Sequence, residues 1–119
     1  MSVGLEAREA TGYGATWWLK SADQPVDITG WIFEAAFERQ TGTTDFALGM
    51  ASAPGEEGFL IHDGAYGGLV VWIEPATLQG IPEPADEFTL QSDLLGTPPN
   101  GVRQFLRALT LTVTKGSTA

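Results

Sequence analysis

The chain has 119 residues, of which 43% are hydrophobic, and its 15 acidic and 6 basic residues give a formal net charge of −9. This length predicts one domain, and this hydrophobic content excludes a disordered chain. The acidity argues against binding to nucleic acid or to anionic membranes, because like charges repel. The sequence contains no cysteine, which excludes disulfides, thiolate catalysis and cysteine-ligated metal sites.

The first eleven residues are polar with scattered small side chains, and we interpret residues 1–11 as a short N-terminal arm, helical or disordered. They lack the apolar core of a signal peptide, and no apolar run in the chain reaches the length of a membrane span. We therefore expect a protein that is made in the cytoplasm and does not enter a membrane. The domain is expected over residues 12–115, with residues 116–119 as a tail.

The segment 12–20, GYGATWWLK, predicts the first strand, because side chains in a strand alternate between two faces. Trp17 shares the core face with Leu19, whereas Trp18 takes the opposite face. One face cannot hold two neighbouring tryptophans, so Trp18 either packs beneath a loop or belongs to an interface. Tryptophan is enriched at the hot spots of protein interfaces.

The segment 27–40, DITGWIFEAAFERQ, carries the strongest pattern in the chain. After a turn it places Trp31, Phe33 and Phe37 on one face, with small and acidic side chains mostly on the other. This alternation predicts a long antiparallel strand whose aromatic face lies on the core. A helix is the alternative, because Ala, Glu and Arg are good helix formers, but it would scatter the three rings around its circumference.

Five further strands are predicted at short spacing, with turn signals between most of them. The segment 75–80 suits one short helical turn, since it begins with proline and ends with Gly80. The pattern as a whole predicts an all-β fold, an antiparallel β-sandwich of about seven strands, with a small closed barrel as the alternative. The five further strands are expected at 45–51, 59–63, 69–74, 86–95 and 102–115.

The sequence contains no convincing catalytic, cofactor-binding or metal-binding motif, so we expect no enzyme and no cofactor. The neighbouring His62 and Asp63 could form a general-base pair, but adjacent strand residues point to opposite faces. The acids at 56–57, at 83–87 and at Asp93 lack the spacing of a calcium loop. A pair of glycosidase carboxylates would need a cleft, for which so small a domain has little room.

The last predicted strand, 102–115, carries two arginines, and Phe105 is expected on the same core face as Leu109, Leu111 and Val113. Arg103 and Arg107 are interpreted either as salt-bridge partners of acids such as Glu34 or Glu38, or as interface residues, because arginine is favoured in interface cores. Trp72 falls on the face opposite to the apolar row of its strand. The candidate interface residues are therefore Trp18, Trp72, Arg103 and Arg107.

Five pieces of the chain, taken in order, resemble the small β-sandwich modules of bacteriophage and prophage tail and baseplate proteins. The resemblance covers roughly residues 12–115, although Phe88 and Leu90 stand where that family carries tyrosines and the turn before the last strand is longer than usual. The pieces are DITGWIFEA at 27–35, GGLVVWI at 67–73, EPATLQGI at 74–81, DEFTLQSDLLG at 86–96 and LTLTVT at 109–114.

The resemblance implies an immunoglobulin-like β-sandwich with a structural role in the virion, in the tail, baseplate or neck, and no enzymatic activity. It further implies other virion proteins as partners, assembly as a homo-oligomer or symmetric array, and synthesis in the cytoplasm of a bacterial host. The residues themselves leave a second hypothesis open. A carbohydrate- or ligand-binding β-sandwich could use Trp18 and Trp72 as a stacking platform.

Overall fold

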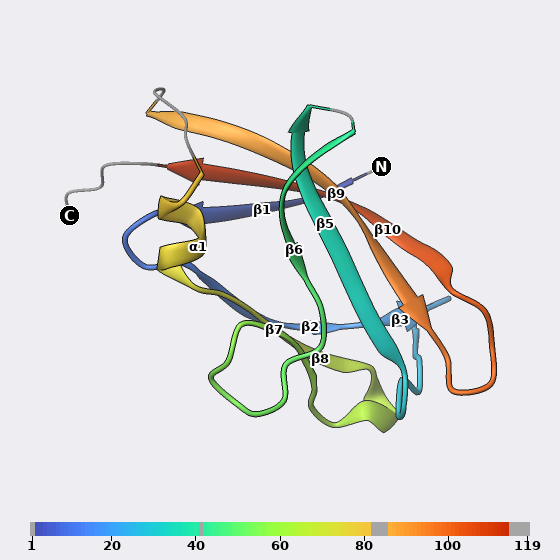
Figure 1. Ribbon diagram of the computed structural model, residues 1–119. Coiled ribbons are helices and arrows are strands. Elements are labelled where there is room, and N and C mark those ends of the chain that lie inside the picture. Colours follow the sequence, from blue (N-terminus) through green and yellow to red (C-terminus); the bar gives the residue numbers. More distant parts are fainter. Residues whose placement is uncertain (1, 41, 82–85, 115–119) are drawn as a thin grey trace.

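The computed structural model describes residues 2–40, 42–81 and 86–114, so the expected tail at 116–119 lies outside the described residues (Figure 1). The prediction of an all-β fold is confirmed, because strands make up most of the described chain. Its elements are β1 (Ser2–Arg8), β2 (Tyr13–Trp18), β3 (Lys20–Ser21), β4 (Gln24–Pro25), β5 (Ile32–Gln40), β6 (Thr43–Leu48), β7 (Gly58–Ile61), the 3-10 turn η1 (Gly64–Tyr66), β8 (Gly68–Ile73), α1 (Pro75–Gln79), β9 (Glu87–Thr97) and β10 (Gln104–Thr114).

The strands form a five-stranded sheet, a three-stranded sheet and a two-stranded pair. The strand order is β1-β10-β9-β5-β6 in the first and β2-β8-β7 in the second, while β3 pairs with β4. The pairing of β1 with β10 is parallel, and the other strand pairs are antiparallel. Within the described residues the strand ladders form separate sheets rather than one closed barrel, and two isolated bridges, Arg8 with Gly12 and Met50 with Phe59, connect the edges of the two larger sheets.

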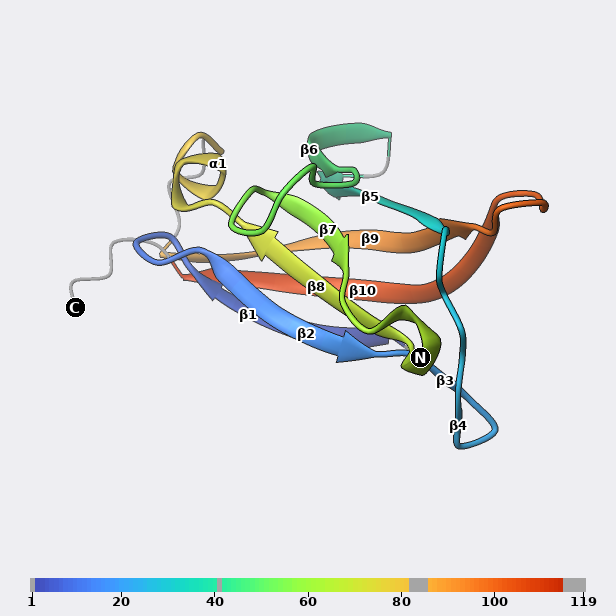
Figure 2. The ribbon, with the colours of Figure 1, turned by 90° about the horizontal axis from the view of Figure 1, so that it is seen from below.

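The two larger sheets face each other as two layers, seen from the side in Figure 1 and overlapping in Figure 2, with the hydrophobic core between them. The aromatic face of β5 lies on this core, because Phe33 and Phe37 are buried. The ring of Phe33 lies 6.4 Å from that of Phe59 in β7, so the contact crosses between the layers. The predicted strand at 27–40 and its buried aromatic face are thus confirmed, and the helix alternative is wrong.

Ten strands are present in the described part of the chain, where the sequence predicted about seven. The additional ones are β1 and the short pair β3 and β4. The interpretation of residues 1–11 as a helical or disordered arm is wrong for most of that segment, because β1 lies at the edge of the five-stranded sheet. Its side chains Leu5 and Ala7 are buried in the core, and its backbone pairs with β10 from Ala108 onward.

A β-bulge near the start of β10 changes which side chains point into the core. The register between β9 and β10 shifts between Phe105 and Arg107, and such an extra residue reverses the alternation on one side of the bulge. Phe105 is therefore 61% exposed, and Leu106 packs against the core in its place. The prediction that Phe105 shares the core face is wrong, whereas Leu109 and the apolar side chains after it are buried as predicted.

The predicted helical turn is confirmed as α1, with Pro75 at its first position. Its Leu78 is fully buried, so the turn covers one end of the core. The carboxylate of Glu57 ties the turn to the loop before β7, because it accepts hydrogen bonds from the backbone N–H of Glu74 at 2.9 Å and from the hydroxyl of Thr77 at 2.6 Å. In the described part of the chain, no helix is long and apolar enough to cross a membrane.

Candidate functional site

A groove opens between the two layers at the end of the molecule where β2 ends and β10 begins. It consists of two adjoining hollows of about 320 Å³ and about 410 Å³. Both hollows are lined by Trp18, Leu19, Leu94 and Arg107, which is why we treat them as one groove and name it the Arg107 groove. Val3 of β1 lines one hollow, and Lys20 of β3 lines the other.

Arg107 lies in the row of β10 side chains that faces the core. It is two residues before the buried Leu109, and alternate residues of a strand share a face. Its partner across the ladder is Leu94 of β9, which is also buried. Arg107 is nevertheless exposed, because it stands at the mouth of the space between the layers rather than inside it. The fold thus places a guanidinium over an apolar floor.

The groove is positively charged in a strongly acidic protein. The described residues that line it include Lys20 and Arg107 but no Asp or Glu. Neither of these two cations forms a salt bridge with another described residue. Arg103, by contrast, lies just before β10 rather than on the strand, and its Nη1 is 3.2 Å from Oε1 of Glu34. The salt-bridge interpretation therefore holds for Arg103 and does not hold for Arg107.

The two candidate tryptophans lie on the outer face of the three-stranded sheet, as the alternation predicts. Trp18 is 49% exposed, and its ring lies edge-on to that of His62 with the centroids 6.3 Å apart. Trp72 is half-buried, and its indole N–H donates a hydrogen bond of 3.0 Å to Glu74. Trp72 pairs with Gly14, which lies four residues before Trp18 on β2. The two tryptophans are therefore separated by about 13 Å along the strand direction.

Two of the four candidate interface residues, Trp18 and Arg107, line the groove, although the ring of Trp18 lies on the outer face against His62; Trp72 and Arg103 are not among the lining residues. The sequence interpretation missed the contributions of Lys20 and Val3. Lys20 belongs to a two-residue strand, and Val3 belongs to the strand that was interpreted as an arm. No local pattern marks either residue, because both reach the groove only through the packing of the two layers.

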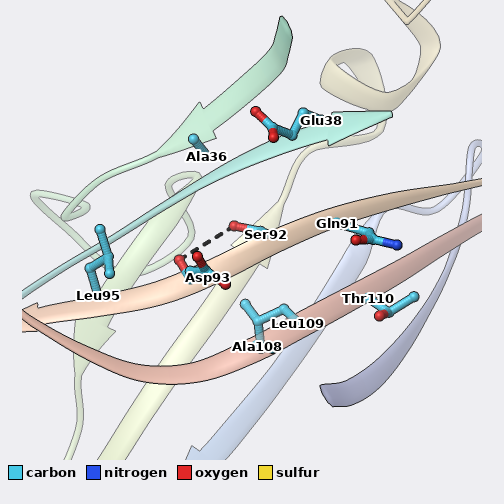
Figure 3. A pocket seen from close by; sticks show the side chains of 9 residues that line it. All are labelled: Ala36, Glu38, Gln91, Ser92, Asp93, Leu95, Ala108, Leu109 and Thr110. Carbon is cyan, nitrogen blue, oxygen red and sulfur yellow. Dashed lines mark hydrogen bonds between the residues drawn. The ribbon is translucent and has the colours of Figure 1, made fainter. Parts of the chain in front are cut away.

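Another hollow, of about 410 Å³, lies along β5, β9 and β10 (Figure 3). The small side chains of Ala36 and Ala108 leave this depression, and Glu38, Asp93 and Gln91 border it. Glu38 already accepts a hydrogen bond from the backbone N–H of Gly42 at 3.3 Å. The described residues contain no group of three or more His, Asp or Glu side chains placed to hold a metal ion. No chemistry can be assigned to this hollow.

His62 follows the end of β7 and is exposed, as is Asp63. Asp63 has a left-handed backbone conformation with φ of 61° and precedes the turn η1. No hydrogen bond joins the two side chains within the described residues, so nothing in this geometry orients His62 as a general base. Its contact is with the ring of Trp18.

The loop before β7 holds one acidic side chain in a fixed position. The carboxylate of Glu56 accepts hydrogen bonds from the hydroxyl of Ser52 at 2.6 Å and from its backbone N–H at 3.1 Å. These two bonds, the hydroxyl first, hold the pKa of Glu56 below its ordinary value of 4.5. A lowered pKa in the folded state contributes stability above the unfolded pKa, and that contribution is lost as the pH falls through the folded pKa.

Replacement of Ser52 by alanine should raise the pKa of Glu56 toward its ordinary value, because the hydroxyl donor is lost. The part of the acid-induced destabilisation that comes from Glu56 should shrink accordingly. Carboxyl carbon shifts recorded by NMR across pH 2–6 would measure both titrations. Asp27 serves as an internal control, because the hydrogen bonds from Thr29 that lower its pKa are untouched. An unchanged Glu56 titration in Ser52→Ala would contradict the assignment.

A comparison with protein-family models finds no match, and a comparison with curated proteins finds none either.

Proposed function

We propose that the chain is a structural protein of a phage or prophage virion, a component of the tail, baseplate or neck that acts by binding other proteins. The observation that carries the proposal is the order of the five sequence pieces that resemble such modules. Each piece falls on a separate element, in the order β5, β8, α1, β9 and β10. An immunoglobulin-like arrangement of the two facing sheets belongs to the same proposal.

The surface features of the chain are compatible with a role in binding other proteins rather than in catalysis. The edge strands β1, β6 and β2 carry backbone groups that can pair with a strand of another chain, whereas the outer edge of β7 is partly covered because Phe59 bonds to Gly49 and Ala51. The Arg107 groove adds an apolar floor with unpaired cations. The proposal includes other virion proteins or further copies of this chain as partners, synthesis in the host cytoplasm and a final place in the virion. It includes no enzymatic activity and no cofactor.

A carbohydrate- or ligand-binding module is the second candidate, and the exposed ring of Trp18 is the observation in its favour. A sugar platform needs two or three coplanar exposed rings. Of the four tryptophans, all within the described residues, only Trp18 is exposed, while Trp17, Trp31 and Trp72 are half-buried. The indole N–H of Trp72 is also engaged with Glu74. This exposure pattern favours the structural proposal.

The mass in solution, measured by light scattering over a wide concentration range, would test the proposal, together with quenching of tryptophan fluorescence and a glycan-binding screen. An increase in mass with concentration, accompanied by shielding of Trp18, would support an assembly component. A saturable glycan interaction that Trp18→Ala abolishes and Trp31→Phe leaves intact would overturn the structural proposal in favour of a binding module.

A further inference from the structure

The molecule is elongated and has two chemically different ends. It measures 43 × 29 × 26 Å. One end carries α1, the turn between β1 and β2, and the start of β9, whereas the other carries the pair β3 and β4 and the turn between β9 and β10 (Figures 1 and 2). The Arg107 groove belongs to this second end, because Lys20 of β3 and Gln104 at the start of β10 line it.

The end that carries α1 is acidic. Contacts link its segments, since the side chain of Gln79 donates to the backbone carbonyl of Glu9 at 3.2 Å and the N–H of Glu9 donates to the carbonyl of Thr114 at 2.9 Å. One basic residue of the described chain, Arg8, also lies at this end, next to Glu9. Glu57 and Glu74 lie beside α1, and Glu87 pairs with Thr114, to which Glu9 is bonded. With the chain neighbours of Glu57 and Glu87, the acidic residues of this end are Glu9, Glu56, Glu57, Glu74, Asp86 and Glu87. We name this surface the acidic end.

The charges of the Arg107 groove are complementary to those of the acidic end. Its floor is apolar, with Leu19, Leu94 and Leu109, and its charged lining residues within the described chain are Lys20 and Arg107. The acids near this end of the molecule, such as Asp23 and Asp27, are not among the residues that line it. A guanidinium without a salt-bridge partner at the mouth of the groove suits a partner surface that offers carboxylates, because arginine pairs with carboxylates in planar geometry.

We propose that the Arg107 groove binds the acidic end of a second copy of this chain, so that copies associate head to tail. The complementary surface is present on the protein itself, at the opposite end of its long axis. A contact between two different surfaces of the same chain produces a ring when the rotation closes and a filament when it does not. The inference rests on the proposed function, since it names the partner surface for assembly.

A pair of charge reversals with equal net charge tests the inference. Arg107→Glu and Arg8→Glu both change the formal net charge from −9 to −11, by removing one positive charge and adding one negative charge. Arg107→Glu, in the groove, should weaken self-association by at least about tenfold, whereas Arg8→Glu, at the acidic end, should leave it unchanged or strengthen it. Sedimentation equilibrium at low and high salt would measure both, and salt should weaken the wild-type association.

A mixing experiment separates head-to-tail contact from other modes. Arg107→Glu chains keep an intact acidic end, and Glu56→Lys/Glu87→Lys chains keep an intact groove. At a concentration at which each variant alone is monomeric, an equimolar mixture should form dimers that grow no further, because only one intact contact remains between the two kinds of chain. Lys20→Glu provides a second groove variant, and denaturant unfolding verifies that each variant is folded.

A monomeric wild-type protein at all concentrations would overturn the inference, and so would equal effects of Arg107→Glu and Arg8→Glu on an associating protein. In the second case the chain would still assemble, through another surface, and the proposed structural function would stand. That function fails on a different result, the glycan interaction that depends on Trp18.

Discussion

Replacement of Phe33 by alanine is expected to lower the free energy of unfolding by about 3–5 kcal/mol, because a large ring is removed from the centre of the core. Phe33 is 0% exposed. Its ring stacks on Trp31 with the centroids 5.9 Å apart, and it faces Phe59 of the other layer at 6.4 Å. Neither neighbour can fill the cavity without leaving its own contacts. Urea-induced unfolding followed by tryptophan fluorescence would measure the loss.

Ile32→Ala is the matched control for Phe33→Ala. Ile32 precedes Phe33 in β5, points to the opposite face and is 55% exposed. Its truncation should change the free energy of unfolding by no more than about 0.5 kcal/mol. Small domains are stable by about 5–15 kcal/mol, so only the Phe33 variant should approach the limit of folding. Equal losses from the two variants would mean that β5 does not separate a core face from a solvent face.

Predictions that rest on alternation within one strand agree with the structure. The aromatic row of β5 and the opposite faces of Trp17 and Trp18 could be read from the sequence, because side chains of a strand alternate whatever it pairs with. The helical turn α1 was equally local, since proline at its start and Gly80 after its end define it. These features require no knowledge of the partner strand.

Features that depend on partners distant in the sequence were missed. The apolar positions of β1 are Val3, Leu5 and Ala7, too few and too small to distinguish an edge strand from an arm. Its burial comes from parallel pairing with β10, more than 100 residues away: Leu5 pairs with Leu111. The bulge at Phe105 also has no local signal, because it is defined by the register with β9. One extra residue there exposed a ring that alternation had placed in the core.

The residues of the candidate site could likewise be predicted only in part from the local sequence. Trp18 and Arg107 could each be singled out by residue type, because tryptophan and arginine are favoured at interfaces. That they line one groove follows only from the stacking of β2 over β9 and β10. The sequence predicts either a salt bridge or an interface role for Arg103, and only the structure shows that its guanidinium pairs with Glu34.

The N-terminal strand makes the second strong prediction. Leu5→Asp should lower the free energy of unfolding by about 3–5 kcal/mol, because Leu5 is 6% exposed on the inner face of the five-stranded sheet. The carboxylate would either lose its hydration inside the core or drive β1 off the sheet. Detachment of β1 would leave the ladder groups of β10 unpaired, so its backbone N–H groups should exchange faster with solvent.

Gly4→Asp separates this burial effect from the effect of added charge. It introduces the same side chain one position earlier on β1, where an added Cβ meets no atom within 4 Å. Gly4 is exposed, so the substitution should cost no more than about 1 kcal/mol and leave exchange in β10 unchanged. If residues 2–8 were an arm without a place in the core, Leu5→Asp and Gly4→Asp would have equal effects on stability. A strand that contributes to the core tolerates only Gly4→Asp. Because Val3 of the same strand lines the Arg107 groove, loss of β1 should also weaken the self-association that the groove supports.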